Sequence, residues 1–136
     1  MRKLIYLFTL LSSFSLLAQA NQAGVKHRKE TVKTVYEKVD RDASFPGGIN
    51  NFRVIFSKRF NTNNVKANAR VIKTVVSFII ERDGTINNIK AVGNNQSFNT
   101  EAINTIKRIE IRWKPALINK QPVRQRYKMP LVMNFE

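Results

Sequence analysis

The 136-residue chain has no cysteine and a single histidine, His27. Without thiols it has no disulfides, no thiol nucleophile and no cysteine-based zinc site. Acidic residues are also scarce, and those from residue 43 onward are Glu81, Asp83, Glu101, Glu110 and Glu136. Since this part has no histidine and no carboxylate pair suited to acid–base catalysis, it has little from which to build a hydrolytic triad or a metal site. We therefore expect neither an enzyme nor a cofactor.

The scarcity of acidic residues leaves the chain strongly basic, with 24 Lys plus Arg against 9 Asp plus Glu and a net charge of +15. Such a charge favours anionic partners. One function therefore stays open on charge alone, namely electrostatic binding of an anionic envelope polymer or a membrane surface. The alternative is a soluble domain whose Lys and Arg are simply solvated.

The chain also lacks a long hydrophobic run. Its uncharged N-terminal stretch, Leu4 to Leu17, is shorter than the ~20 residues that span a bilayer. Arg2 and Lys3 precede this stretch and Ala18-Gln19-Ala20 follows it, which is typical of a secretory signal peptide. We expect cleavage after Ala20, leaving an exported chain of net charge +13 that does not meet nucleic acid. An uncleaved inner-membrane anchor is the alternative.

Residues 21–42 form a polar arm or linker of mixed charge. Val32, Val35, Tyr36 and Val39 recur at helix-like spacing, so this segment predicts either a short helix or an extended docking arm. His27 lies here and is expected to be solvated. The predicted folded domain is residues 43–136.

The densest apolar run of that domain is residues 71–92, VIKTVVSFIIERDGTINNIKAV. Its first half is rich in β-branched residues and has apolar side chains on both faces at period two, which indicates a central strand. Gly84 adopts positive φ readily, so Arg82-Asp83-Gly84 predicts a turn, after which residues 85–92 return. We predict an antiparallel hairpin around which the other elements pack.

Two amphipathic helices flank the hairpin. The apolar stripe of the first is Ile49, Phe52, Ile55, Phe56 and Phe60. The stripe of the second is Phe98, Ala102, Ile103, Ile106 and Ile109. Asn99 is expected to cap the second helix, with Glu101 near its positive end.

The final run, residues 123–135, alternates cleanly. Its predicted core face is Val123, Tyr127, Met129, Leu131, Met133 and Phe135. Pro130 cannot donate a hydrogen bond to a ladder, so this strand is expected at a sheet edge. The predicted fold class is α+β, a three-stranded antiparallel sheet with two helices packed on one face, in the order helix-strand-strand-helix-strand.

Five short motifs, in order along residues 43–136, resemble the C-terminal domain of the TonB family. They are Phe45-Pro46-Gly47-Gly48, VVSFIIERDGTI from Val75 to Ile86, Glu101-Ala102, Trp113-Lys114-Pro115, and NKQPVR from Asn119 to Arg124. The chain departs from the family at Phe60-Asn61, where a Tyr-Pro pair is usual, and at Arg70-Val71-Ile72, where a glycine is usual.

The resemblance implies a periplasmic module that grips an extended segment of an outer-membrane transporter and so contributes to transport across that membrane. In the family, the peptide adds as a strand beside the domain's last strand. We therefore predict a binding edge at Arg124, Gln125, Arg126, Tyr127 and Lys128, which would pair with the guest through backbone bonds. Membrane contact is expected only by proximity.

Two alternatives for the predicted edge stay open. The arm, residues 32–39, could cover it, or a second copy of the chain could do so in a homodimer.

Overall fold

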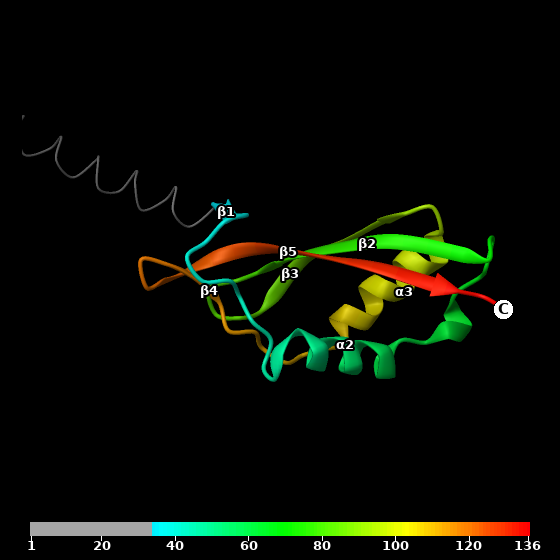
Figure 1. Ribbon diagram of the computed structural model, residues 1–136, viewed down its shortest axis with the longest axis horizontal. Coiled ribbons are helices and arrows are strands. Elements are labelled where there is room, and N and C mark those ends of the chain that lie inside the picture. The colour runs from blue at the N-terminus through cyan, green and yellow to red at the C-terminus, as the bar shows by residue number, and fades with distance from the viewer. Residues whose placement is uncertain (1–33) are drawn as a thin grey trace, which may run out of the picture. The chain divides into compact units, whose positions relative to one another are not determined.

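The computed structural model describes residues 34–136 (Figure 1). The predicted signal peptide, its cleavage site after Ala20, His27 and most of the predicted arm lie outside the described residues. The described elements, in chain order, are β1 (Val35–Tyr36), α2 (Gly48–Arg59), the 3-10 turn η1 (Thr62–Asn64), β2 (Val71–Ile80), β3 (Ile86–Gly93), α3 (Gln96–Lys107), β4 (Ala116–Ile118) and β5 (Gln121–Asn134). The α+β class predicted from the sequence is confirmed.

The three long strands form the predicted antiparallel core of the sheet. β2 lies between β3 and β5, with Val75 opposite both Val92 and Pro130. A register shift between Ser77 and Ile79 interrupts the pairing with β3. The prediction of a central strand at residues 71–80 is therefore confirmed.

The sheet has two further strands. The sequence pattern did not predict β4, whereas β1 lies in the arm that was left open as one alternative cover for the edge of the last strand. β1 runs parallel to β5, with Val35 opposite Arg124 and Tyr36 opposite Gln125. β4 pairs antiparallel with the start of β5. The sheet is therefore mixed and five-stranded, in place of the predicted three antiparallel strands. Strands of two and three residues carry no readable alternation, because their pairing rests on the backbone.

The β4–β5 hairpin owes its turn to Asn119 and Lys120, which both have positive φ, 49° and 63°. Positive φ at both central residues is the geometry of the tight turn that suits twisted antiparallel strands. The turn at Asn119 and Lys120 joins β4 to β5, where the sequence pattern predicted only the second of these strands.

Both helices pack on the same face of the sheet. The main core cluster joins Phe52 and Phe56 of α2, Ala102 and Ile106 of α3, and the inward-facing residues of β2, Val76, Phe78 and Ile80. The other face of the sheet carries no helix among the described residues.

The start of α3 differs from the prediction. Asn95 is the N-cap, and its side-chain oxygen accepts from the Phe98 N–H at 2.8 Å. Asn99 lies inside the helix, where its amide donates to the Gly93 carbonyl at 2.8 Å. The prediction that Asn99 caps the helix and places Glu101 in the first turn is therefore wrong. Either asparagine can cap, and the point at which the chain leaves β3 decides between them.

Candidate peptide-binding site

The last strand has an open edge. β5 pairs with β2 along one side, from Gln125 to Asn134. On its other side β1 covers only Arg124 and Gln125. Within residues 34–136, no strand covers that side from Arg126 to Asn134. At ~3.3 Å per residue this is roughly 30 Å of unpaired backbone, enough to accept a short extended segment.

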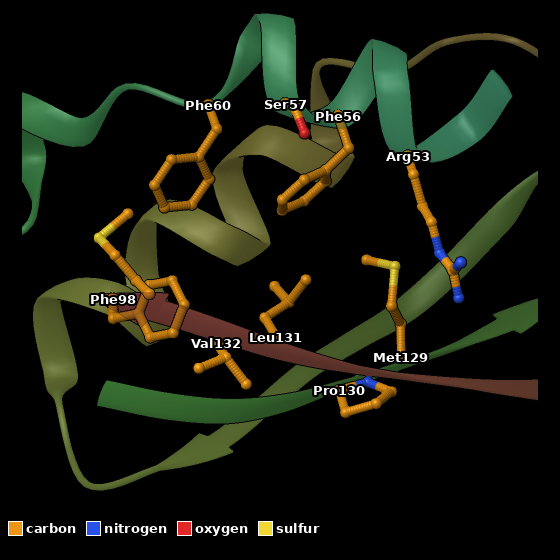
Figure 2. A pocket seen from close by; sticks show the side chains of 10 residues that line it. Arg53, Phe56, Ser57, Phe60, Phe98, Met129, Pro130, Leu131 and Val132 are labelled. Carbon is orange, nitrogen blue, oxygen red and sulfur yellow. The ribbon is translucent and has the colours of Figure 1, made fainter. Parts of the chain in front are cut away.

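A groove of about 340 Å³ lies between α2 and the second half of β5 (Figure 2). In Figure 2, Arg53 and Ser57 of α2 and Phe60 just after it lie on the helix side of the groove, while Met129 and Leu131 extend from β5 toward the helix. The rest of the lining is Phe56, Phe98, Pro130, Val132 and Met133. The groove is therefore mainly apolar and runs beside the open edge.

Arg53 is the one charged side chain in the lining of this groove. It is exposed, and its positive charge acts on Tyr127. Burial raises the pKa of the Tyr127 phenol above its ordinary value of 10.0, and the charge of Arg53 opposes that rise. Since no carboxylate lines the groove, Arg53 is placed to receive an acidic side chain from outside the domain.

The first two predicted site residues are already engaged within the domain. The Arg124 guanidinium donates to both carboxylate oxygens of Glu81, at 2.8 and 3.0 Å. This hydrogen bonding raises the pKa of Arg124. Gln125 is buried, accepts from the Ala43 N–H at 2.8 Å and donates to Asp42 at 2.6 Å. Both residues are already paired with β1, so neither presents a free edge.

The other three predicted residues lie where β1 ends and the open edge begins. Arg126 is 3.4 Å from the Glu37 carboxylate. Tyr127 packs into the aromatic core, its ring 5.3 Å from that of Phe78 and 5.2 Å from that of Trp113. Lys128 is exposed. Two of the five predicted residues therefore pair with β1 and three lie on the open edge, which continues toward the C-terminus.

The sequence pattern did not assign to the site the residues of β5 that line the groove, Met129 to Met133. Their alternation correctly placed Met129, Leu131 and Met133 on the core face. It gave no signal that α2 would stand far enough from this end of the strand to leave a groove. Of the two forms predicted for the arm, the extended docking arm is the one that Val35–Tyr36 adopts.

The described residues offer little for other kinds of site. No group of three or more potential metal ligands occurs within residues 34–136. None of the helices described there is long and apolar enough to cross a membrane.

Comparison with known proteins gives a family but no individual relative. No curated protein and no solved structure matches the chain. The family described as Gram-negative bacterial TonB protein C-terminal matches residues 64–135, just over half of the sequence. The match includes the three long strands and α3, and so the open edge of β5, but it begins after α2. On this match, the chain belongs to the family of Gram-negative bacterial TonB C-terminal domains.

Proposed function

We propose that this domain is a non-enzymatic periplasmic module that recruits an extended segment of an outer-membrane transporter, by strand addition along Arg126–Asn134 of β5, and so contributes to transport. At the level of the family, such domains are periplasmic and bind outer-membrane transporters. The observation that carries the proposal for this chain is the open edge with an apolar groove beside it.

Backbone pairing would supply much of the affinity. Each hydrogen bond gained in this way contributes about 0.5–1.5 kcal/mol net. Pro130 has no N–H, and proline occurs in edge strands with its nitrogen toward the open side. The guest would therefore find one donor missing near the middle of its footprint.

Side-chain selection would come from the groove. Successive residues of an added strand point to opposite faces, so every second guest residue would face α2. These residues would contact Phe60 and Leu131, and one of them would lie near Arg53. The guest is thus an extended segment with apolar residues at alternate positions and an acidic residue among them.

β1 limits where the guest can lie. Because Val35 and Tyr36 already pair with Arg124 and Gln125, a guest reaching those residues would have to displace β1. The proposed footprint therefore begins at Arg126. Compared with the predicted site, residues 124–128, it starts two residues later and extends further toward the C-terminus.

Val132→Pro tests strand addition. Val132 is exposed, and it lies two residues from Pro130, so its N–H points to the same open side. Proline there removes a donor from the guest ladder and leaves the pairing with β2 intact. We expect peptides from transporter N-termini to bind Val132→Pro about tenfold more weakly in calorimetric titrations. Val132→Ala, which keeps the N–H, should bind within about twofold of wild type.

A second pair of variants tests whether the charge of Arg53 in the groove contributes to peptide binding. Arg53→Glu should weaken binding of an acidic peptide, whereas Lys58→Glu makes the same charge change on α2 outside the groove lining and should not. Equal peptide affinity in the folded Val132→Pro and Val132→Ala variants would sink strand addition at this edge. If Arg53→Glu and Lys58→Glu weaken peptide binding equally, Arg53 contributes only through the net charge of the domain and not through a contact in the groove.

The electrostatic alternative makes a different prediction about salt. Binding driven by the net charge of the chain weakens steeply as ionic strength rises, because exposed charges are screened over about 10 Å at 0.1 M. Strand pairing with apolar contacts should retain most of its affinity. Titration of the same peptide at low and high salt separates the two functions.

The proposal of a non-enzymatic role is supported by how the domain uses its carboxylates. Glu81 is bonded to Arg124 and Asn87, and Glu101 to Arg108 and Asn64. Both therefore serve the fold.

A further inference from the structure

The face of the sheet opposite α2 and α3, here called the outer face, carries an apolar patch. β2 contributes Val71 and Val75, β3 contributes Val92, and β5 contributes Pro130 and Val132. The register places Val75 between Val92 and Pro130, in one row across the three strands. Val132 lies in the next row, opposite Lys73. These residues therefore form one continuous surface.

The patch is unusually exposed for apolar residues. The exposed fractions are 75% for Val92, 58% for Val132, 48% for Val71 and 43% for Val75. They are four of the six large hydrophobic residues that are exposed in the described part of the chain. Single exposed valines need no explanation, but four gathered on one face of a sheet indicate a surface that binds something apolar.

Lysines surround the patch. Lys90 and Lys128 flank Ser77 in the row beside Val75, two strand spacings or roughly 10 Å apart. Lys73 lies on the opposite side of Val75, and all three lysines are exposed. None of them forms an ion pair with another residue of the 34–136 segment. The sequences of β2, β3 and β5 contain no Asp or Glu, so no strand residue neutralises this face.

We propose that the outer face docks on the surface of an anionic phospholipid bilayer. In this arrangement the valines lie at the boundary of the acyl region and the lysines contact the headgroup phosphates. A basic polar surface combined with exposed apolar side chains is the chemistry by which proteins lie on anionic membranes. Each lysine near such a surface strengthens binding by about fivefold.

Charge argues against the other occupants. A second copy docked through the same face would bring the two sets of lysines together, with no carboxylate on these strands to pair with them. An anionic polysaccharide would satisfy the lysines but would leave the valine row without an apolar partner. A lipid surface satisfies both.

The lipid-binding patch and the proposed guest footprint share Pro130 and Val132 of β5, and the other residues of the patch belong to β2 and β3. The groove beside α2 lies on the helix side of the sheet (Figure 2), whereas Lys90 and Val92 lie on the outer face and on β3, away from the open edge of β5. The two sites can therefore be tested independently with variants of β3 and β2.

The test is co-sedimentation of the protein, as recovered from the periplasmic fraction, with phosphatidylcholine vesicles that contain or lack phosphatidylglycerol. All variants carry the same N-terminus. Lys73→Glu/Lys90→Glu should lower partitioning onto the anionic vesicles at least tenfold relative to wild type, whereas Lys58→Glu on α2 should change it by less than about threefold. Val92→Ser should lower it about threefold or more, while Val54→Ser, at an α2 valine that is 49% exposed, should not.

Absence of wild-type binding to the anionic vesicles would overturn the proposal. So would losses that follow net charge alone, with Lys58→Glu as damaging per charge as the lysine pair. Concentration-dependent dimers that Val92→Ser abolishes would assign the face to a second copy. Peptide affinity measured in the same variants should stay unchanged. Failure of the lipid-docking proposal therefore leaves the proposed peptide binding intact, and failure of peptide binding leaves lipid docking intact.

Discussion

At the scale of single residues, Gly84 shows how one position meets two requirements. Its φ is +82°, a conformation that the sequence pattern anticipated from the Asp-Gly turn. The structure adds a second constraint, because the Gly84 carbonyl accepts from the Trp113 N–H at 2.9 Å. A Cβ on Gly84 would lie 1.9 Å from the Trp113 carbonyl oxygen. The turn of the hairpin is thus held against the segment that follows α3.

Gly84→Ala is therefore expected to be severely destabilising, by on the order of 3 kcal/mol or more, since positive φ strain and a backbone clash add. Gly48→Ala is the matched control, because Gly48 has φ +83° but nothing within 4 Å of its would-be Cβ. That variant should cost only about 1–2 kcal/mol. Chemical denaturation of both measures the difference. Equal losses would mean that contact with Trp113 has no energetic weight.

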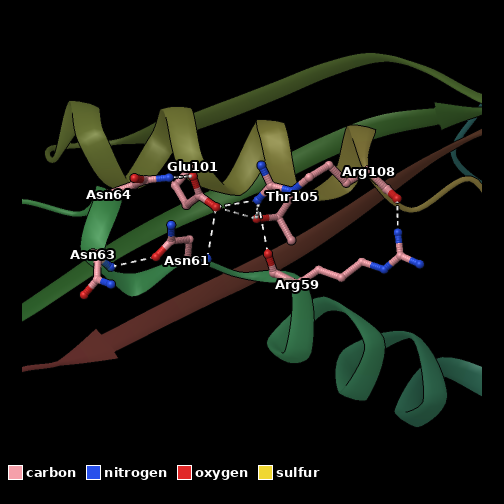
Figure 3. Close-up of polar contacts among 7 residues, drawn as sticks. All are labelled: Arg59, Asn61, Asn63, Asn64, Glu101, Thr105 and Arg108. Atoms are coloured by element: carbon pink, nitrogen blue, oxygen red, sulfur yellow. Dashed lines mark hydrogen bonds and ion pairs between the residues drawn. The ribbon is translucent and has the colours of Figure 1, made fainter.

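Glu101 is the buried carboxylate of the fold, with 2% of its surface exposed (Figure 3). It accepts from the Asn61 N–H at 3.0 Å, the Asn64 amide at 2.8 Å and the Thr105 hydroxyl at 3.2 Å, and it pairs with Arg108. Loss of solvation acts to raise the pKa of Glu101. The hydrogen bonds outweigh it, so the pKa falls below its ordinary value of 4.5.

Because the folded state lowers this pKa, the unfolded chain binds the proton more tightly. The contribution of Glu101 to stability is therefore present above pH 4.5 and is lost as the pH falls through the lower folded pKa. We expect Glu101→Gln to lower the free energy of unfolding at pH 7 by about 1–3 kcal/mol. The variant should also lose less stability than wild type on acidification. Denaturation across the acid range checks this, with the exposed Glu110→Gln as control.

At the scale of elements, β2 organises the core. Phe78 is fully buried, and its ring lies 5.3 to 6.3 Å from those of Tyr127, Trp113 and Phe52. It therefore joins β2 to α2, to β5 and to the segment after α3.

Phe78→Ala should lower the free energy of unfolding by about 3–5 kcal/mol, because the truncated side chain leaves a cavity among rings from several elements. Val75→Ala, on the exposed face of the same strand, should change it by about 0.5 kcal/mol or less. A melting temperature of Phe78→Ala within about a degree of wild type would contradict the burial of this face.

The short strands act differently from the long ones. β1 and β4 owe little to side-chain pattern, and the segment that follows β1 is held by Gln125, which bonds to Ala43 and Asp42. Backbone pairing of this kind is available to any extended segment that reaches the edge. The same property that lets β1 cover Arg124 and Gln125 makes the rest of β5 a place for a guest.

At the scale of the whole molecule, export decides which partners the domain meets. We predict that the N-terminal residue of the protein recovered from cells is Asn21, because a charged start, a short apolar run and Ala-x-Ala precede it. N-terminal sequencing of the protein in the periplasmic and inner-membrane fractions measures this. Intact chain in the inner membrane would restore the anchored alternative.

The sequence by itself determined the elements whose side chains repeat over several turns or residues. Period two fixed β2 and β5 and which of their faces are buried, and the phenylalanine spacing fixed α2. Each of these depends on burial of one face, which a local pattern records. The short motifs along residues 43–136 also indicated the family, because they are local runs of residues that need no knowledge of what lies beside them in space.

Only the tertiary structure decided what depends on neighbours that are distant in the sequence. The sequence left open whether the arm or a second copy covers the last strand, and the structure shows β1 of the arm paired with its start. This pairing is made by backbone groups that every residue carries, so no residue type specifies it. The choice of Asn95 over Asn99 as the cap depends on where β3 ends. The groove lies between α2 and β5, and the spacing between two elements cannot be read from the sequence of either one.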